Sequence, residues 1–232
     1  MKTLKLLAVL FLLISISSCG DDDDDGETED IQQLVEKFAS PEVLQTLEDL
    51  GFVFRQSTDI PNDVIGTFVF NPNILSTTSI EDDGFDIGTE FPPLMISFSD
   101  IDNENRTFVF EASQGGITFN LISTFLTGDD SGFNAYAQVE FTNNNSETAI
   151  FILAFSGVIT PEGITSGQNV FALLSASDEG PGSNFIAPGE GRLFIDSDGL
   201  VERVDGEDDN SILDNSNILY QQGLSSLISR RE

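Results

Sequence analysis

Histidine and tryptophan are absent from this chain of 232 residues, and cysteine occurs once. The lack of histidine removes the commonest general base and the commonest ligand of transition metals. A serine nucleophile would have no histidine to activate it, and the chain has no glycine-rich loop with a lysine to hold a phosphate. We therefore expect that the protein is not an enzyme.

Basic residues are also scarce, with 9 Lys and Arg against 40 Asp and Glu and a net charge of −31. Proteins bind the phosphates of nucleic acids through Lys and Arg, so we expect no nucleic-acid partner. The same charge disfavours direct contact with an anionic lipid surface. It is compatible with solubility in a medium rich in salt or divalent cations.

The single cysteine, Cys19, follows a segment that is typical of an export signal. Lys2 and Lys5 precede an apolar run over residues 6–16, which is shorter than the roughly 20 residues of a membrane-spanning helix. Ile16-Ser17-Ser18-Cys19 resembles a bacterial lipobox, which implies removal of residues 1–18 and attachment of palmitate or a similar acyl chain to Cys19. The alternatives are an ordinary secretory signal with an unrelated cysteine and a short membrane anchor.

An acidic run follows Gly20, and it consists of Asp21, Asp22, Asp23, Asp24 and Asp25. Such a run is typical of a solvated tether, which we assign to residues 19–29. Residues 19–25 also resemble the export signal of surface lipoproteins of Bacteroidota. That resemblance implies a protein anchored by lipid in the outer membrane and facing the cell exterior. Each buried methylene of an acyl chain contributes about 0.8 kcal/mol, so no transmembrane helix would be needed.

The hydrophobic spacing divides the remaining chain into three parts. Residues 30–50 have helical spacing and predict two short helices, separated at Ser40-Pro41, that cap a sheet or close the end of a barrel. Residues 51–210 alternate between apolar and polar side chains and predict strands, beginning at Phe52 and ending with an edge strand over 200–204. Residues 211–232 predict a C-terminal helix.

The clearest strand covers residues 133–141, with Asn134, Tyr136, Gln138 and Glu140 expected on a solvated face. Residues 148–159 are apolar on both faces and predict a central strand, covered outside by one of the helices. Ile117, Leu121 and Phe125 are expected to share one face of a strand. Such strands, joined mostly by hairpins, predict a mainly β protein with an antiparallel meander that closes into an up-and-down barrel or forms a sandwich.

The body resembles a group of Bacteroidota lipoproteins. The resemblance rests on Leu50-Gly51-Phe52, on residues 61–68, on Ser156-Gly157 with Gly163-Ile164, and on residues 188–194 with 196–199. It covers about residues 50–204 and implies a lipocalin-like β fold. No activity and no functional residue come with it.

Carboxylates cluster near the end of the body, at Asp196, Asp198, Asp205, Glu207 and Asp209. Oxygen ligands at alternate positions suit Ca²⁺, which takes six to eight of them. The spacing does not match an EF-hand, because Leu200 occupies the third ligand position counted from Asp196. The alternative is a solvated hairpin turn in an acidic protein.

Phenylalanine is the main aromatic residue, with 20 copies. On the inward strand faces we expect Phe108, Phe110, Phe119, Phe133 and Phe141. A barrel of about eight strands can hold one small apolar ligand if its interior is not filled, so these residues are candidates for a ligand site. The alternative is that they are simply the core.

The sequence thus favours a lipid-anchored surface protein without enzymatic activity that binds a small apolar ligand or a partner. Two alternatives remain open. One is a structural or adhesive envelope module that binds glycan or protein through its loops. The other is a hydrolase that uses a pair of carboxylates. A cavity lined by Phe would favour the first hypothesis.

Overall fold

The computed structural model describes residues 35–36, 38–55, 57, 59–114, 117–118, 120–129, 132–142, 146–178 and 185–204. The predicted signal, the tether with Cys19 and Asp21 to Asp25, and the predicted C-terminal helix lie outside these residues. One complete helix is described, α2 (Pro41–Asp49), with a 3₁₀ turn η1 (Asn62–Val64). Ahead of α2 only three residues are described as helical, so the prediction of two helices is confirmed for the second one alone.

Twelve strands of the described chain form one antiparallel sheet. They are β1 (Gly66–Phe70), β2 (Asn73–Thr78), β3 (Glu90–Phe91), β4 (Leu94–Asp102), β5 (Thr107–Gln114), β6 (Ile117–Thr118), β7 (Asn120–Gly128), β8 (Gly132–Thr142), β9 (Thr148–Thr160), β10 (Gly163–Ala176), β11 (Gly191–Asp196) and β12 (Leu200–Val204). The mainly β prediction is confirmed. The segment at Phe52 and Phe54, predicted as a strand, is instead extended chain with a single bridge from Ser57 to Gly128.

Two pairs of consecutive strands behave as single kinked strands. Only Asn71-Pro72, joined by a cis peptide bond, separates β1 from β2, and these strands pair with β12 and β11 respectively. β11 and β12 both run along β10, with a break at residues 197–199. The prediction that residues 200–204 form an edge strand is therefore wrong, because β12 has β10 on one side and β1 on the other.

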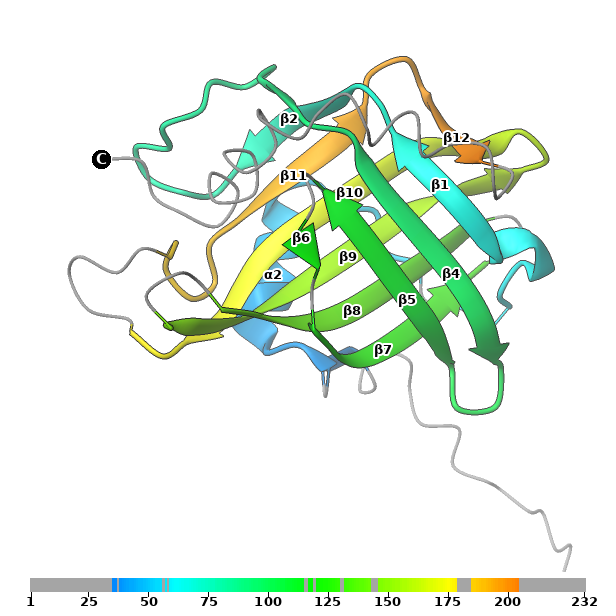
Figure 1. The fold of residues 1–232 in the computed structure, drawn as a ribbon, viewed down its shortest axis with the longest axis horizontal. Coiled ribbons are helices and arrows are strands. Elements are labelled where there is room, and N and C mark those ends of the chain that lie inside the picture. Colours follow the sequence, from blue (N-terminus) through cyan, green and yellow to red (C-terminus); the bar gives the residue numbers. More distant parts are fainter. Residues whose placement is uncertain are drawn as a thin grey trace, which may run out of the picture.

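With these kinks, the chain runs as an antiparallel meander, as predicted. β4 pairs with β1 and β5, and the ladders continue from β7 through β8 and β9 to β10. The predicted closure into an up-and-down barrel is wrong for the strand ladders, because β5 and β7 share no ladder in the described chain. Figure 1 shows β1, β4 and β5 crossing in front of β7 to β10, with α2 on the far side.

The larger core lies between these two groups of strands and is dominated by phenylalanine. Phe98 is at its centre, with ring centroids 5.4 Å from Phe108, 5.7 Å from Phe133 and 6.0 Å from Phe155. Offset and edge-on ring pairs at such distances are favourable and fill space densely. Alternation places Phe108 and Phe133 on the inward faces of their strands, as predicted.

A second core covers the outer face of β8 to β11 and is formed by α2 and the extended segment after it. Ser40 caps the helix by accepting a hydrogen bond from the Val43 amide at 3.4 Å, and Pro41 occupies its first turn. Val43 and Leu47 are buried in this core, where α2 packs on β10 and β11. β9 lies between β8 and β10, as predicted for a central strand, and its residues Ile152 and Ala154 are buried in the same core. The helix predicted to cover residues 148–159 thus lies mainly on β10 and β11.

The predicted solvated face of β8 is wrong at three positions. Asn134 is fully buried and donates to the Val53 carbonyl at 2.8 Å. Tyr136 packs on Phe38 and Phe52, and Gln138 donates to the Phe38 carbonyl. Chain segments distant in sequence cover this face, so the side-chain amides of Asn134 and Gln138 are satisfied by backbone carbonyls rather than by water.

A bulge in β7 explains another wrong expectation. Leu121 pairs with Val139 and Ser123 with Gln138, so Ile122 is an extra residue. An extra residue reverses the faces of the strand beyond it. Phe125 consequently lies in the outer core, on the opposite face from Leu121, and Leu126 takes its place in the larger core.

Candidate functional site

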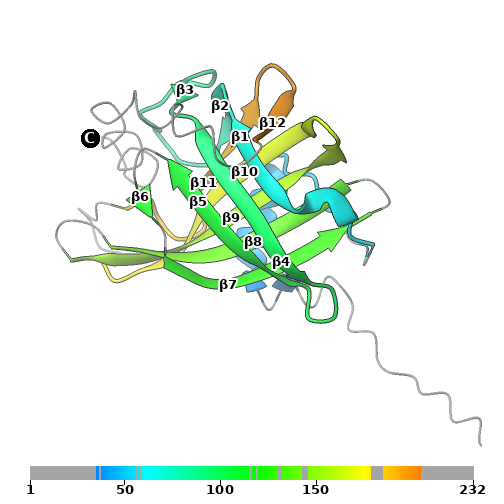
Figure 2. The same cartoon turned by 45° about the vertical axis from the view of Figure 1, so that its right-hand side comes forward.

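The hairpin of β5 and β7 is joined at its two ends and open between them. Near the turn, Ser113 and Gln114 pair with β6. At the other end the Leu126 amide donates to the Arg106 carbonyl at 2.9 Å, and the Thr124 hydroxyl donates to the Phe108 carbonyl at 2.8 Å. Within the described residues, 109–112 and 120–123 are not paired with each other, and Figure 2 shows the two strands diverging there.

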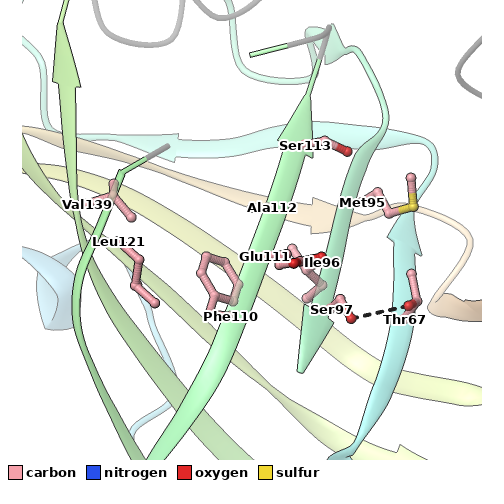
Figure 3. A pocket seen from close by; sticks show the side chains of 10 residues that line it. All are labelled: Thr67, Met95, Ile96, Ser97, Phe110, Glu111, Ala112, Ser113, Leu121 and Val139. Carbon is pink, nitrogen blue, oxygen red and sulfur yellow. Dashed lines mark hydrogen bonds between the residues drawn. The ribbon is translucent and has the colours of Figure 1, made fainter. Parts of the chain in front are cut away.

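A cavity of about 500 Å³ lies at this opening. Five of its lining side chains belong to the inward strand faces or to the inner edge of the opening: Ile96, Phe110, Ala112, Leu121 and Val139. Five belong to the outward faces of β1, β4 and β5: Thr67, Met95, Ser97, Glu111 and Ser113. Figure 3 shows both groups, with Phe110 facing the gap toward Leu121 and with Thr67, Met95 and Ser97 on the other side of β5.

The two groups differ in chemistry. The inward group is entirely apolar, and the outward group carries three hydroxyls and one carboxylate. The Thr67 hydroxyl donates to the Ser97 hydroxyl at 3.3 Å, and Glu111 is exposed. The described lining includes no Lys or Arg. Apolar walls with a few polar groups at one side are typical of a site that binds a ligand, and no side chain of this set is placed to act as an activated nucleophile.

Of the five predicted phenylalanines, the structure places one in this lining, Phe110. Phe108 and Phe133 are buried in the core around Phe98, and Phe141 is half-buried with its ring 6.3 Å from that of Phe185. Phe119 lies outside the described residues. Most of the predicted ligand site is thus packed core, because the rings meet one another across the interior.

Sequence reasoning missed Met95, Ser97 and Glu111. These residues occupy outward positions of regular strands, and nothing in their own pattern distinguishes them from a solvated face. The opening that makes them part of a cavity depends on the missing ladder between β5 and β7. A signal was present in the adjacent apolar residues Leu121 and Ile122: alternation puts neighbours on opposite faces, so one of the two apolar side chains has to lie off the inward face.

The predicted Ca²⁺ ligands are only partly within the described chain. Asp196 accepts hydrogen bonds from the amides of Asn71 at 2.9 Å and Asp198 at 3.2 Å, and Asp198 accepts one from the Leu200 amide at 3.0 Å. No group of three or more metal-ligating side chains occurs among the residues that the structure describes. Asp205, Glu207 and Asp209 lie outside them, so Ca²⁺ binding stays a prediction.

The two aspartates differ in electrostatics. Burial, followed by the hydrogen bond with Asp198, raises the pKa of Asp196 to about 6. Hydrogen bonds from the Leu200 amide and from Asp196 lower the pKa of Asp198. The pair therefore keeps one proton up to about pH 6, and its hydrogen bonds join the kink between β1 and β2 to the kink between β11 and β12.

A buried ion pair joins Arg192 of β11 to Asp83 of the loop between β2 and β3. Arg192 donates to both carboxylate oxygens of Asp83, at 2.7 and 2.8 Å, and its guanidinium lies 5.2 Å from the ring centre of Phe85. The two side chains are 1% and 3% exposed. This pair holds the loop between β2 and β3 against the core, where Ile80 and Phe85 pack.

A second cavity, of about 400 Å³, lies between the helical region and the outer face of β8. Leu44, Phe54 and Tyr136 line it, with Glu48 and Arg55. Arg55 is paired with Asp129. Its lining mixes acidic, basic and apolar groups without the separation seen at the β5–β7 opening.

Within the described part of the chain, no helix combines the length and apolar character required to cross a bilayer. Comparisons with protein-family models, with curated proteins and with solved structures find nothing that matches this chain.

Proposed function

We propose that this protein binds a small apolar ligand in the cavity at the β5–β7 opening, and that it does so at the cell surface, held there by a lipid on Cys19. The observation that carries the proposal is a cavity of about 500 Å³ that reaches from the outward side chains of β4 and β5 to Phe110 inside. Ligand sites typically measure about 300–1,000 Å³ and combine apolar walls with a few polar groups.

A lipocalin-like barrel, left unjoined between β5 and β7, is the finer part of this proposal. Apart from the β5–β7 gap, the strands from β4 to β12 pair in chain order, and β12 returns to β1, which pairs with β4; this order supports the proposal. In that arrangement the opening is a lateral entrance to the interior. A ligand there replaces the side chain and backbone contacts that a continuous ladder would have made.

The anchor part of the proposal rests on the amino-terminal sequence, with Cys19 directly after Ile16-Ser17-Ser18 and before the acidic run. A ligand-binding domain on a charged tether is exposed to solutes outside the cell. The strongly negative charge keeps it from lying on anionic lipid.

A cavity-filling substitution tests the ligand site. The chain has no tryptophan, so its own fluorescence does not interfere with the neutral apolar dye N-phenyl-1-naphthylamine. We expect the wild-type protein to bind this dye and Ala112→Phe to weaken binding at least about tenfold, which corresponds to about 1.4 kcal/mol. Val109→Phe is the matched control, because Val109 is 43% exposed on the same strand and does not line the cavity.

The dye titration is read together with the urea midpoint of each variant. Equal weakening by both substitutions, or no dye uptake by the wild-type protein, would contradict the proposal. A loss confined to Ala112→Phe in a protein of unchanged stability supports it.

A second candidate function is binding of a partner protein at the same opening. Val109, Leu121 and Ile122 are 43%, 41% and 50% exposed beside strand segments that have no described partner in the gap. Exposed apolar edges of this kind accept an added strand from another chain. This candidate predicts no uptake of the dye, so the same titration separates the two.

A further inference from the structure

We infer that the ligand of the β5–β7 cavity is an uncharged amphiphile, with its apolar end against Phe110 and a hydroxyl or amide end at Ser97 and Ser113. The inference rests on the proposed function and specifies its ligand. Three observations support it: the lining has an apolar side and a hydroxyl-bearing side, the one charged side chain in the described lining is the carboxylate of Glu111, and packed phenylalanine rings lie behind Phe110.

The division of the lining sets the orientation of the ligand. The inward side chains, represented by Phe110 and Val139, offer only carbon atoms. On the outward side, Ser97 and Ser113 offer hydroxyls that both donate and accept hydrogen bonds. A molecule that is apolar throughout would leave these hydroxyls to water, and a molecule that is polar throughout would be desolvated against Phe110 without partners.

The charge of the lining selects against a carboxylate. Glu111 is the one charged side chain in the described lining, and it stands on the outward side with the hydroxyls. No Lys or Arg is present in that lining to pair with an anion. A fatty acid placed with its carboxylate at Ser97 or Ser113 would face the carboxylate of Glu111 within a protein of net charge −31.

The packed core behind the cavity limits how far the apolar end of the ligand can enter the interior. The ring of Phe110 is 5.4 Å from that of Phe155 and 5.8 Å from that of Phe98. These contacts are those of a filled interior, so the apolar end stops at Phe110.

Two probes of equal chain length, decanol and decanoate, test the inference by displacing bound N-phenyl-1-naphthylamine at neutral pH and constant salt. For the wild-type protein we expect decanol to displace the dye at a concentration at least about tenfold below that of decanoate. Glu111→Gln should reduce this ratio severalfold by improving decanoate alone. The control is Glu104→Gln, which removes the same charge from the exposed turn between β4 and β5 and should leave the ratio unchanged.

Each outcome of this experiment is decisive. Equal displacement by the two probes, or a ratio that Glu111→Gln does not change, overturns the inferred ligand class while dye binding itself still supports the site. A ratio that falls equally in Glu104→Gln shows a general charge effect and also overturns it. Absence of dye binding to the wild-type protein removes the proposed function and this inference together.

Discussion

Arg192 buries its guanidinium beside the ring of Phe85, where an unpaired charge would be very costly. Burial acts to raise the pKa of Asp83, but hydrogen bonds from Arg192 and Thr78 and the charge of Arg192 outweigh it and hold that pKa below its usual value. Asp83 therefore remains ionised and keeps both guanidinium contacts at neutral pH. The pair fixes the loop that carries Ile80 and Phe85 into the core.

Replacing one member of this ion pair should lower the free energy of unfolding by more than half the loss caused by replacing both members together. We expect Asp83→Leu or Arg192→Leu alone to lower the free energy of unfolding by about 3–5 kcal/mol, because each leaves a buried charge without its partner. The variant with both substitutions should lose less free energy of unfolding than the two single variants added together, because it leaves no buried charge unpaired. Urea unfolding of the three variants measures this, and strictly additive losses would show that the two side chains are not coupled.

Hydrogen bonds join the kink between β1 and β2 to the kink between β11 and β12. Asp196 accepts from the Asn71 amide beside the first kink, and the Ser197 amide donates to the Pro72 carbonyl at 3.4 Å. Nearby, buried Asn169 donates to buried Asn73 at 3.1 Å. A polar cluster thus holds β1, β2, β11 and β12 at the point where each strand pair bends.

The raised pKa of Asp196 predicts a pH dependence of stability. Since this group binds its proton more tightly in the folded protein than in the unfolded chain, its contribution is complete below about pH 4 and is lost as the pH rises to about 6. The loss is at most about 1.4 kcal/mol per pH unit. Asp196→Asn should remove this dependence, so its stability relative to the wild type should increase between pH 4 and about pH 6.

Urea unfolding at several pH values checks this prediction. Asp100→Asn is the control, because it removes one exposed carboxylate from β4 at a site where φ is +47°, which asparagine tolerates. If the stability curves of Asp196→Asn and the wild type run parallel over this range, the Asp196 carboxyl does not carry the raised pKa.

At the scale of the whole molecule, the proposed anchor and the β body have separate tasks. The body carries the cavity, and the acidic tether with Cys19 would keep it near the envelope without contact with anionic lipid. No disulfide can form within the body, because Cys19 is the only cysteine of the chain. Its stability must come from packing of the two cores and from polar contacts such as the Arg192–Asp83 pair.

Labelling with palmitate in cells tests the anchor. We expect the label to enter the wild-type chain and to be absent from Cys19→Ala, which lacks the only thiol. Ser18→Ala is the matched control, since it keeps a small residue before the cysteine and should retain the label. Label in Cys19→Ala, or none in the wild-type chain, would contradict a lipid on Cys19.

Much of the fold could be predicted because its cause is local. Residues 133–141 alternate in a way that only a strand accommodates, and the inward positions Phe133 and Val139 are buried as predicted. Pro41 after Ser40 located the start of α2. For the same reason the candidate site was predicted only at Phe110. A side chain's inward direction is a property of its own strand, but whether it meets another ring or a cavity is not.

The sequence by itself determined most of the strands and the inward apolar face of strands such as β5 and β8, because the spacing of two residues is visible in neighbouring side chains. Tertiary structure alone decided that Asn134 is covered, through contacts such as its hydrogen bond to Val53, 81 residues away. It also decided that the hairpin of β5 and β7 stays open, since residues 109–112 pair with β4 and residues 120–123 with β8 but not with each other in the described chain. Both outcomes depend on which distant segments meet, and no local pattern encodes that.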